Sequence, residues 1–174
     1  FTLVRTATES FLERRKTLFD HRIEQGRIRD CHGDLRAEHV YMDDGVKIID
    51  CIEFNKRFRY QDIACDLAFL SMDLDFRGHR HVSHELLKAY SKKTGDRDVF
   101  NLIDFYKIYR AMVWVKVNCF HIDKDRPGEP ERARVLADIR KYMKIAGRYA
   151  DKIIRPSVWV VCGMIAAGKS TIAD

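Results

Sequence analysis

The sequence CHGDLRAEH at residues 31–39, followed by VKIID at residues 46–50, decides how this chain folds. Residues 40–42 (VYM) and 46–49 (VKII) have the composition of two short strands. Between them lies DDG at residues 43–45, which indicates a tight turn because Gly and, to a lesser degree, Asp tolerate positive φ. The two segments are therefore predicted to form a β-hairpin.

The expected register of this hairpin brings three polar side chains to its open end. With the last two residues of DDG at the centre of the turn, Val40 pairs with Ile49. His39 then lies opposite Asp50, and the loop that carries Asp34 ends at the same point. Two carboxylates and one imidazole converge. This arrangement suits the binding of a divalent metal ion and the orientation of a hydroxyl group beside a phosphate.

These residues also carry a resemblance to a known family. HGD at residues 32–34, a residue five positions further on, and the ID pair ending at Asp50 resemble the catalytic loop and metal-binding segment of aminoglycoside phosphotransferases and related small-molecule kinases. The fold of that family is similar to that of eukaryotic protein kinases. The resemblance implies that Asp34 orients or deprotonates the acceptor hydroxyl and that Asp50 holds Mg²⁺. It also implies that His32 braces the loop.

The sequence departs from the family pattern HGDxxxxN at one position, because His39 stands where the family has Asn. The position makes His39 a candidate metal ligand, but Mg²⁺ prefers hard oxygen ligands. The alternatives are that His39 hydrogen-bonds a phosphate or Asp34, that the metal keeps an extra water, or that Asn55 supplies the missing amide oxygen. Downstream, QDIACDLA at residues 61–68 resembles the family's GDPxxDLA segment, which implies that Asp66 braces the catalytic loop.

Helical periodicity accounts for most of the remaining chain, and FNKRFRY at residues 54–60 is interpreted as a loop. The helices are expected at residues 5–24, 62–75, 81–93, 99–122 and 129–154. One hairpin with about five helices predicts an α+β fold, mainly α, which matches the helical C-terminal lobe of a kinase-like fold. No glycine-rich phosphate loop or strand lysine precedes the hairpin, so we expect the nucleotide-binding N-lobe to be absent.

A second nucleotide-binding motif closes the sequence. The apolar run VWVVC at residues 158–162 precedes GMIAAGKST at residues 163–171, which fits GxxxxGK[ST]. In this motif backbone N–H groups wrap the phosphates, the lysine reaches the terminal phosphates and the serine binds Mg²⁺. The predicted nucleotide-binding residues are Gly163, Gly168, Lys169, Ser170 and Thr171, with Ser170 also a metal ligand.

The motif order suggests two domains. Residues 1–155 would form the phosphotransferase-like lobe, and residues 156–174 would be the first strand and P-loop of a truncated α/β NTPase-type domain. This order resembles bacterial two-domain proteins described as bifunctional aminoglycoside phosphotransferase/ATP-binding proteins. Because the chain starts at Phe1 and stops just after the P-loop, we interpret it as a fragment.

Composition narrows the class of protein. With 46% hydrophobic and 33% charged residues, the 174-residue chain is typical of a soluble globular protein, and it has no apolar run of membrane-spanning length or signal peptide. Five cysteines without CxxC spacing indicate small buried thiols in a reducing cytoplasm. A net charge of +6 is compatible with nucleotides and a poor match to polycationic aminoglycosides. No basic-aromatic motif predicts a nucleic-acid partner.

The sequence therefore favours an ATP- and Mg²⁺-dependent phosphotransferase that acts on a hydroxyl of a small molecule. The alternative is a pseudokinase-like binding or regulatory module that serves the P-loop domain. The acceptor is not readable from the sequence, since its contacts are expected between residues 75 and 151. Without an N-lobe, the isolated chain should be inactive, with an exposed apolar surface near residues 29–31 and 51–54.

Overall fold

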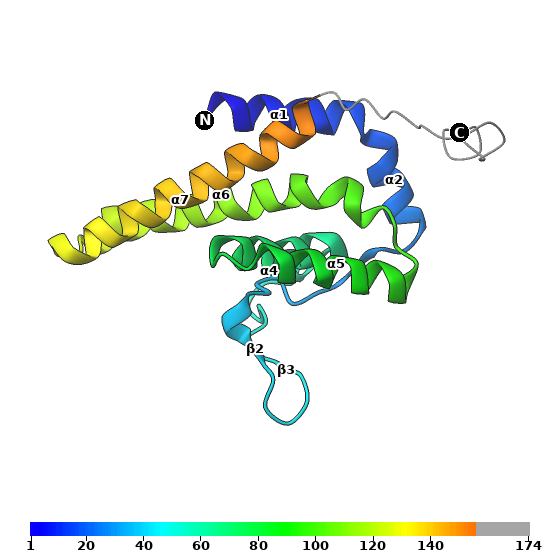
Figure 1. Ribbon diagram of the computed structural model, residues 1–174, viewed down its shortest axis with the longest axis horizontal. Helices are drawn as coiled ribbons and strands as arrows, with labels where there is room; N and C mark the ends of the chain where they lie inside the picture. The colour runs from blue at the N-terminus through cyan, green and yellow to red at the C-terminus, as the bar shows by residue number, and fades with distance from the viewer. Residues whose placement is uncertain (156–174) are drawn as a thin grey trace, which may run out of the picture.

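The computed structural model describes residues 1–155, which form a mainly helical α+β fold (Figure 1). The long helices are α1 (Thr2–Arg14), α2 (Lys16–Glu24), α4 (Ile63–Phe76), α5 (Arg80–Thr94), α6 (Val99–Asp125) and α7 (Glu129–Ile154). The short elements are β1 (Ile28–Asp30), η1 (Ala37–His39), β2 (Val40–Tyr41), β3 (Lys47–Ile48), α3 (Lys56–Arg59) and β4 (Tyr60–Asp62). The predicted fold class is confirmed at this level.

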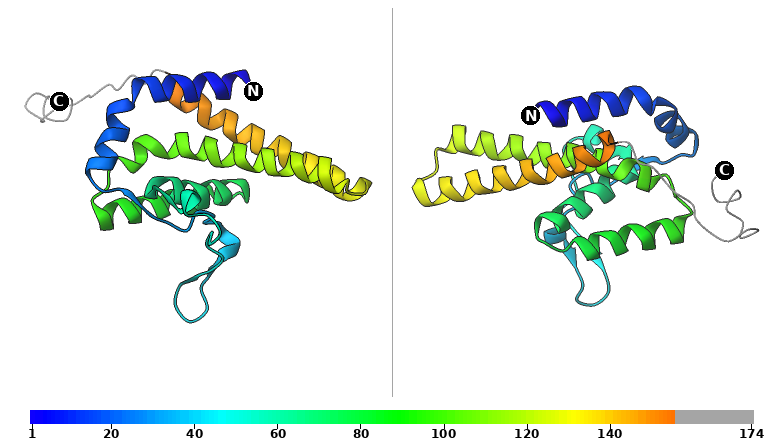
Figure 2. Two further views of the ribbon diagram at one scale, coloured as in Figure 1. Left: turned by 180° about the vertical axis from the view of Figure 1, so that it is seen from behind. Right: turned by 45° about the horizontal axis from the view of Figure 1, so that its top comes forward.

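The two longest helices, α6 and α7, run antiparallel and form the centre of the molecule, with α1 across one side and α4 on the other (Figures 1 and 2). The turn between them places Arg126 in the left-handed region, at φ 46°. Their contact contains small residues, Ala111 and Ala146, which let the backbones approach closely. Phe69 and Met72 of α4 fill the same core and are almost completely buried.

A buried ion-pair network joins α2 to the starts of α4 and α6. Arg22 is only 1% exposed; its Nε and Nη2 donate to Asp62 at 2.9 and 2.6 Å, and its Nη1 donates to Asp96 at 2.5 Å. Asp62 also caps α4 by accepting from the amide of Ala64 at 2.8 Å. One guanidinium thus fixes the helix that follows the candidate site, because a buried charge is tolerated only with its partners in place.

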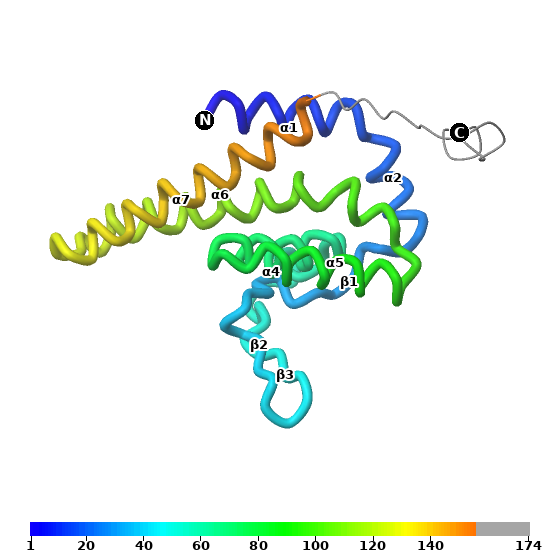
Figure 3. The backbone as a smooth tube through the Cα atoms, viewed as in Figure 1, coloured from blue at the N-terminus to red at the C-terminus, as the bar shows by residue number. Residues whose placement is uncertain are grey.

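Most predicted helices are confirmed, and α7 begins and ends at the predicted residues. The helix predicted over residues 5–24 is two helices, because the backbone at Arg15 leaves helical geometry at φ −116° and ψ 22°. The loop predicted over residues 54–60 is wrong for its second half, which forms α3 and then β4. In that strand Tyr60 pairs with Asp30 of β1. Strand β1 lies beside α5 (Figure 3).

The hairpin forms, but its predicted register is wrong by one residue. Val40 pairs with Ile48 instead of Ile49, and the amide of Ile49 donates to the carbonyl of His39 at 3.0 Å. A two-residue type I′ turn requires positive φ at both central positions. In the loop at residues 42–46 only Gly45 has positive φ, at 83°. The hairpin therefore closes through five residues instead of two.

The structure of residues 1–155 also tests the expectations about cysteine burial and membrane spans. The prediction of buried thiols holds for Cys65 but is wrong for Cys51 and Cys119, which are exposed, and Cys31 is half-buried. None of the helices formed by residues 1–155 is both long and apolar enough to cross a membrane. The strand at residues 158–162 and the P-loop at residues 163–171 lie outside the described residues.

Candidate functional site

The loop at residues 31–36 is anchored by a buried carboxylate of α4. Asp66 is 7% exposed, and its two oxygens accept from the amides of His32 at 2.7 Å and Gly33 at 3.0 Å. Gln61 Nε2 donates to the same carboxylate at 3.0 Å. Burial raises the pKa of Asp66, and the two amide bonds oppose this shift by favouring the charged form. The bracing role implied for Asp66 matches this geometry.

Gly33 is required by the path of this loop. Its φ is 86°, and a Cβ at this position would lie 3.0 Å from the carbonyl oxygen of Phe58 and 3.1 Å from the side chain of Ile52. Any larger residue would meet both backbone strain and a close contact. The middle residue of HGD is thus fixed by geometry.

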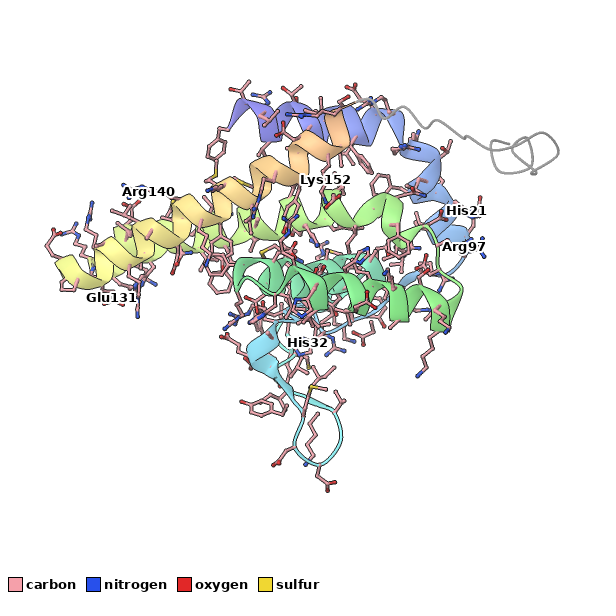
Figure 4. All side chains as sticks on the ribbon, viewed as in Figure 1. His21, His32, Arg97, Glu131, Arg140 and Lys152 are labelled. Atoms are coloured by element: carbon pink, nitrogen blue, oxygen red, sulfur yellow. The ribbon has the colours of Figure 1, made fainter. Side chains whose placement is uncertain are left out.

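His32 links the loop to the segment that carries Asp50. Its Nε2 bonds the carbonyl of Ile49 at 2.7 Å, and its Nδ1 accepts from the amide of Asp34 at 3.3 Å. The carbonyl can only accept, so Nε2 carries the proton. The amide of Ile52 also donates to the carbonyl of His32 at 3.0 Å. His32 lies where the hairpin meets the helices (Figure 4). It lies between the segments that carry Asp34 and Asp50 and is hydrogen-bonded to both.

His39 lies between the two predicted carboxylates. Its Nδ1 donates to the carbonyl of Asp34 at 2.9 Å and lies 4.0 Å from an oxygen of the Asp34 carboxylate. Its Nε2 lies 3.3 Å from Asp50 Oδ2. In the neutral tautomer with the proton on Nδ1, Nε2 is an acceptor that can take a hydrogen bond from Arg36 Nη2 at 3.3 Å, so Asp50 is its neighbour and not its hydrogen-bond partner. The predicted convergence of Asp34, His39 and Asp50 is present, although the register that led to it was wrong.

Arg36 belongs to the same cluster as Asp34, His39 and Asp50, although the sequence did not indicate it as a site residue. Its Nε lies 3.3 Å from Asp34 Oδ2, its Nη2 is 3.3 Å from His39 Nε2, and its Nη1 is 2.5 Å from Glu38. The guanidinium also stacks 4.7 Å from the ring centre of Trp114 on α6. The only signal in the sequence was its place inside the HGDxxxxN pattern, two residues after Asp34.

Asp50 has an unusual backbone and an open side chain. Its φ is 64°, which is uncommon for a residue with a Cβ, and its side chain is 74% exposed. Such strain often occurs at functional positions. The residues that the structure describes contain no group of three or more His, Cys, Asp or Glu side chains poised around one metal ion. Mg²⁺ in phosphoryl transfer is usually held by one or two carboxylates, with waters and phosphates completing the shell.

Asp34 lies at the boundary of two cavities. One cavity of about 600 Å³ is lined by Asp34, Asp50 and residues 51–54. The other, about 690 Å³, runs from Asp34 between the segment at residues 52–62 and α6. Asp34 is the one carboxylate that lines both, so a group bound in either cavity comes within reach of it.

Apolar side chains are exposed next to the smaller cavity. Phe54 is 83% exposed, and Ile48 and Ile49 are about half exposed. Cys51 between them is also exposed. The exposed apolar surface expected near residues 51–54 is therefore present. The same expectation is wrong for residues 29–31, where the exposed side chains are the charged Arg29 and Asp30 and Cys31 is half-buried.

The chain is similar to uncharacterized proteins of Mycobacterium bovis and of two strains of Mycobacterium tuberculosis. Each is 37% identical over 166 residues, which cover 95% of this chain. The chain spans about a third of the length of these curated relatives, 32% in each case. No protein-family profile matches the chain, and no solved structure matches it. The function therefore has to be argued from the site.

Proposed function

We propose that the protein to which this chain belongs transfers the γ-phosphoryl group of ATP to a hydroxyl of a small molecule. The observation that carries this proposal is the position of Asp34, which faces two cavities on a loop held by hydrogen bonds to the buried carboxylate of Asp66. Phosphoryl transfer depends on placing an acceptor and a nucleotide on either side of one carboxylate. A surface turn with acidic residues would not need this bracing.

The residues divide the chemistry among them. Asp34 accepts or orients the proton of the acceptor hydroxyl, and Arg36, 3.3 Å away, holds that carboxylate in place. His32 and Asp66 are positioning residues that fix the loop. Asp50, which is open to solvent, is assigned to Mg²⁺; the ion neutralises charge on the phosphates when bound.

His39 is a second candidate ligand for the metal. Two adjacent ligands of an octahedral Mg²⁺ lie about 3 Å apart, because each is about 2.1 Å from the ion. His39 Nε2 and Asp50 Oδ2 are separated by 3.3 Å, which is compatible with this geometry. Arg36 now donates toward the same nitrogen, so His39 becomes available only if Arg36 withdraws.

The test measures Mg²⁺-dependent phosphate transfer from ATP by the full-length protein, with Lys169→Ala disabling the predicted P-loop. Asp34→Asn should reduce turnover at least about a thousandfold, as expected when a base and an orienting group are both lost. Asp44→Asn is the matched control, since Asp44 is an exposed carboxylate at the tip of the same hairpin. Equal turnover in Asp34→Asn and Asp44→Asn would disprove the proposal.

The alternative function is a pseudokinase-like module that serves the P-loop domain. It is favoured by His39, whose ring is hydrogen-bonded at both nitrogens and occupies the place of a family metal ligand. Nucleotide binding to the intact first domain that does not depend on Mg²⁺ or Mn²⁺ would support this alternative. Gain of activity in His39→Asn would point the same way.

A further inference from the structure

The cavity on the α6 side of Asp34 combines an apolar wall with positive charge. Its apolar and aromatic lining consists of Ile52, Phe54, Phe58, Tyr109, Val113 and Phe120, among others. Three cations also line it, Arg57, Arg110 and Lys116. Lys116 lies over the ring of Phe120, with its Nζ 5.5 Å from the ring centre. The cavity is thus both apolar and cationic.

The acids that line this cavity are already paired. Asp62 is bound by Arg22 through both oxygens, and Asp34 lies 3.3 Å from Arg36. Arg57, Arg110 and Lys116, by contrast, form no ion pair with any described residue. The cavity therefore has an excess of positive charge, which favours an anionic ligand over a neutral or cationic one.

Of the three cations, Arg110 gives the best evidence for an anionic ligand, because its side chain is buried in the cavity wall. It is 6% exposed, and its guanidinium lies 4.6 Å from the ring centre of Phe69. Its Nη2 donates to the amide oxygen of Gln61 at 2.7 Å, a neutral partner. Its Nε has no hydrogen-bond partner among the described residues. Arg110 makes no direct ion pair, because Gln61 separates it from the buried carboxylate of Asp66. An anionic ligand in the cavity would give this guanidinium a direct partner and reduce the cost of burying it.

We propose that this cavity binds the acceptor, and that the acceptor is a hydroxy acid with an apolar or aromatic body. This inference rests on the proposed phosphotransferase function only in naming the ligand as an acceptor. The carboxylate is recognised by Arg110 and Lys116, and the apolar body lies against the aromatic wall. The hydroxyl is left to point toward Asp34, at the mouth shared with the smaller cavity. A sugar phosphate would match the positive charge of the cavity, but it is polar on all sides and does not match the apolar wall.

The test compares three ligands of nearly equal size by calorimetry on the full-length protein without nucleotide. They are 4-(hydroxymethyl)benzoate, the neutral 4-(hydroxymethyl)benzamide and the cationic 4-(aminomethyl)benzyl alcohol. We expect the benzoate to bind at least about tenfold more tightly than the other two. Glucose 6-phosphate is measured beside them and should bind more weakly than the benzoate.

Variants locate the effect. Lys116→Glu changes an exposed side chain, so it should leave folding intact while removing most of the preference for the benzoate. Arg110→Gln should have the same effect. Arg140→Gln is the matched control, since it removes an exposed cation of α7 that lies far from His32 and the hairpin (Figure 4). The control should keep the full preference.

Each outcome decides the inference. Equal or absent binding of the three ligands, tighter binding of the amine, or tighter binding of glucose 6-phosphate would overturn it. Because binding is measured without ATP, the result is independent of phosphate transfer. If the protein prefers the benzoate but fails the Asp34→Asn test, the anion site is supported and the proposed phosphotransferase function is disproved. If the protein transfers phosphate but does not prefer the benzoate, only the assignment of the acceptor as a hydroxy acid is disproved.

Discussion

Replacing Asp66 with Asn should loosen the loop that carries Asp34 without unfolding the protein. The Asp66 carboxylate accepts from the amides of His32 and Gly33, whereas Asn offers one oxygen and one NH₂ group. One buried amide then faces a donor, which costs about 1–3 kcal/mol. Part of this cost is recovered, since burial disfavours the charged carboxylate and raises its pKa. We expect the free energy of unfolding to fall by about 2 kcal/mol, within the range for such a change.

The assay combines urea denaturation with amide hydrogen exchange. A loss of about 2 kcal/mol that is local to the loop should speed exchange of the His32 and Gly33 amides about thirtyfold, because each 1.4 kcal/mol is a factor of ten. Asp20→Asn is the control, since Asp20 is an exposed carboxylate of α2, and it should change neither measurement. Unchanged exchange at both amides in Asp66→Asn would refute the role given to Asp66.

Three other predictions follow from the same contacts. Gly33→Ala should lower the free energy of unfolding by about 1–3 kcal/mol in urea denaturation, because it adds a Cβ at φ 86°. Burial raises the pKa of Asp96, but its bond to Arg22 and its other partners outweigh this and hold the pKa below the usual value. The stability that this carboxylate contributes is therefore present above about pH 4 and lost as the pH falls below it, so the stability difference between the protein and Asp96→Asn should shrink in acid. At pH 8 iodoacetamide should label exposed Cys51 well before Cys65, since burial raises the pKa of Cys65 to about 11; mass spectrometry of the peptides measures both.

The sequence predicted the convergence of the site better than the register that was used to predict it. A shift of one residue normally moves a side chain to the other face of a hairpin. Here the left-handed backbone at Asp50 turns the chain immediately after β3, and its carboxylate reaches His39 in spite of the shift. The turn was misjudged because Asp44 does not take the positive φ that a two-residue loop requires. Local propensity could not reveal this, since either loop length suits the same residues.

Features formed by distant parts of the chain were harder to predict. The helices follow from apolar periodicity, which is local, and so their positions were largely correct. The pairing of β1 with β4 involves three residues on each side, too few for an alternating pattern. Arg110 appears in the sequence as one of several polar residues of α6, and its place in the cavity wall depends on the fold of residues 52–62 over α6.

The two carboxylates of the site are held with different firmness, and this difference suits their proposed roles. The loop that carries Asp34 is held by hydrogen bonds to the buried carboxylate of Asp66. Asp34, the residue proposed to orient the acceptor, is therefore in place before any ligand binds. Asp50 follows a hairpin whose loop and strands are largely exposed, and among the described residues 1–155 the polar side chain next to its carboxylate is the imidazole of His39. Few buried contacts mean a low cost of local opening. We therefore expect slow amide exchange at Gly33 to coexist with fast exchange at residues 42–46, while the bonds of His32 to Ile49 and Ile52 keep the segment of Asp50 close to the loop of Asp34.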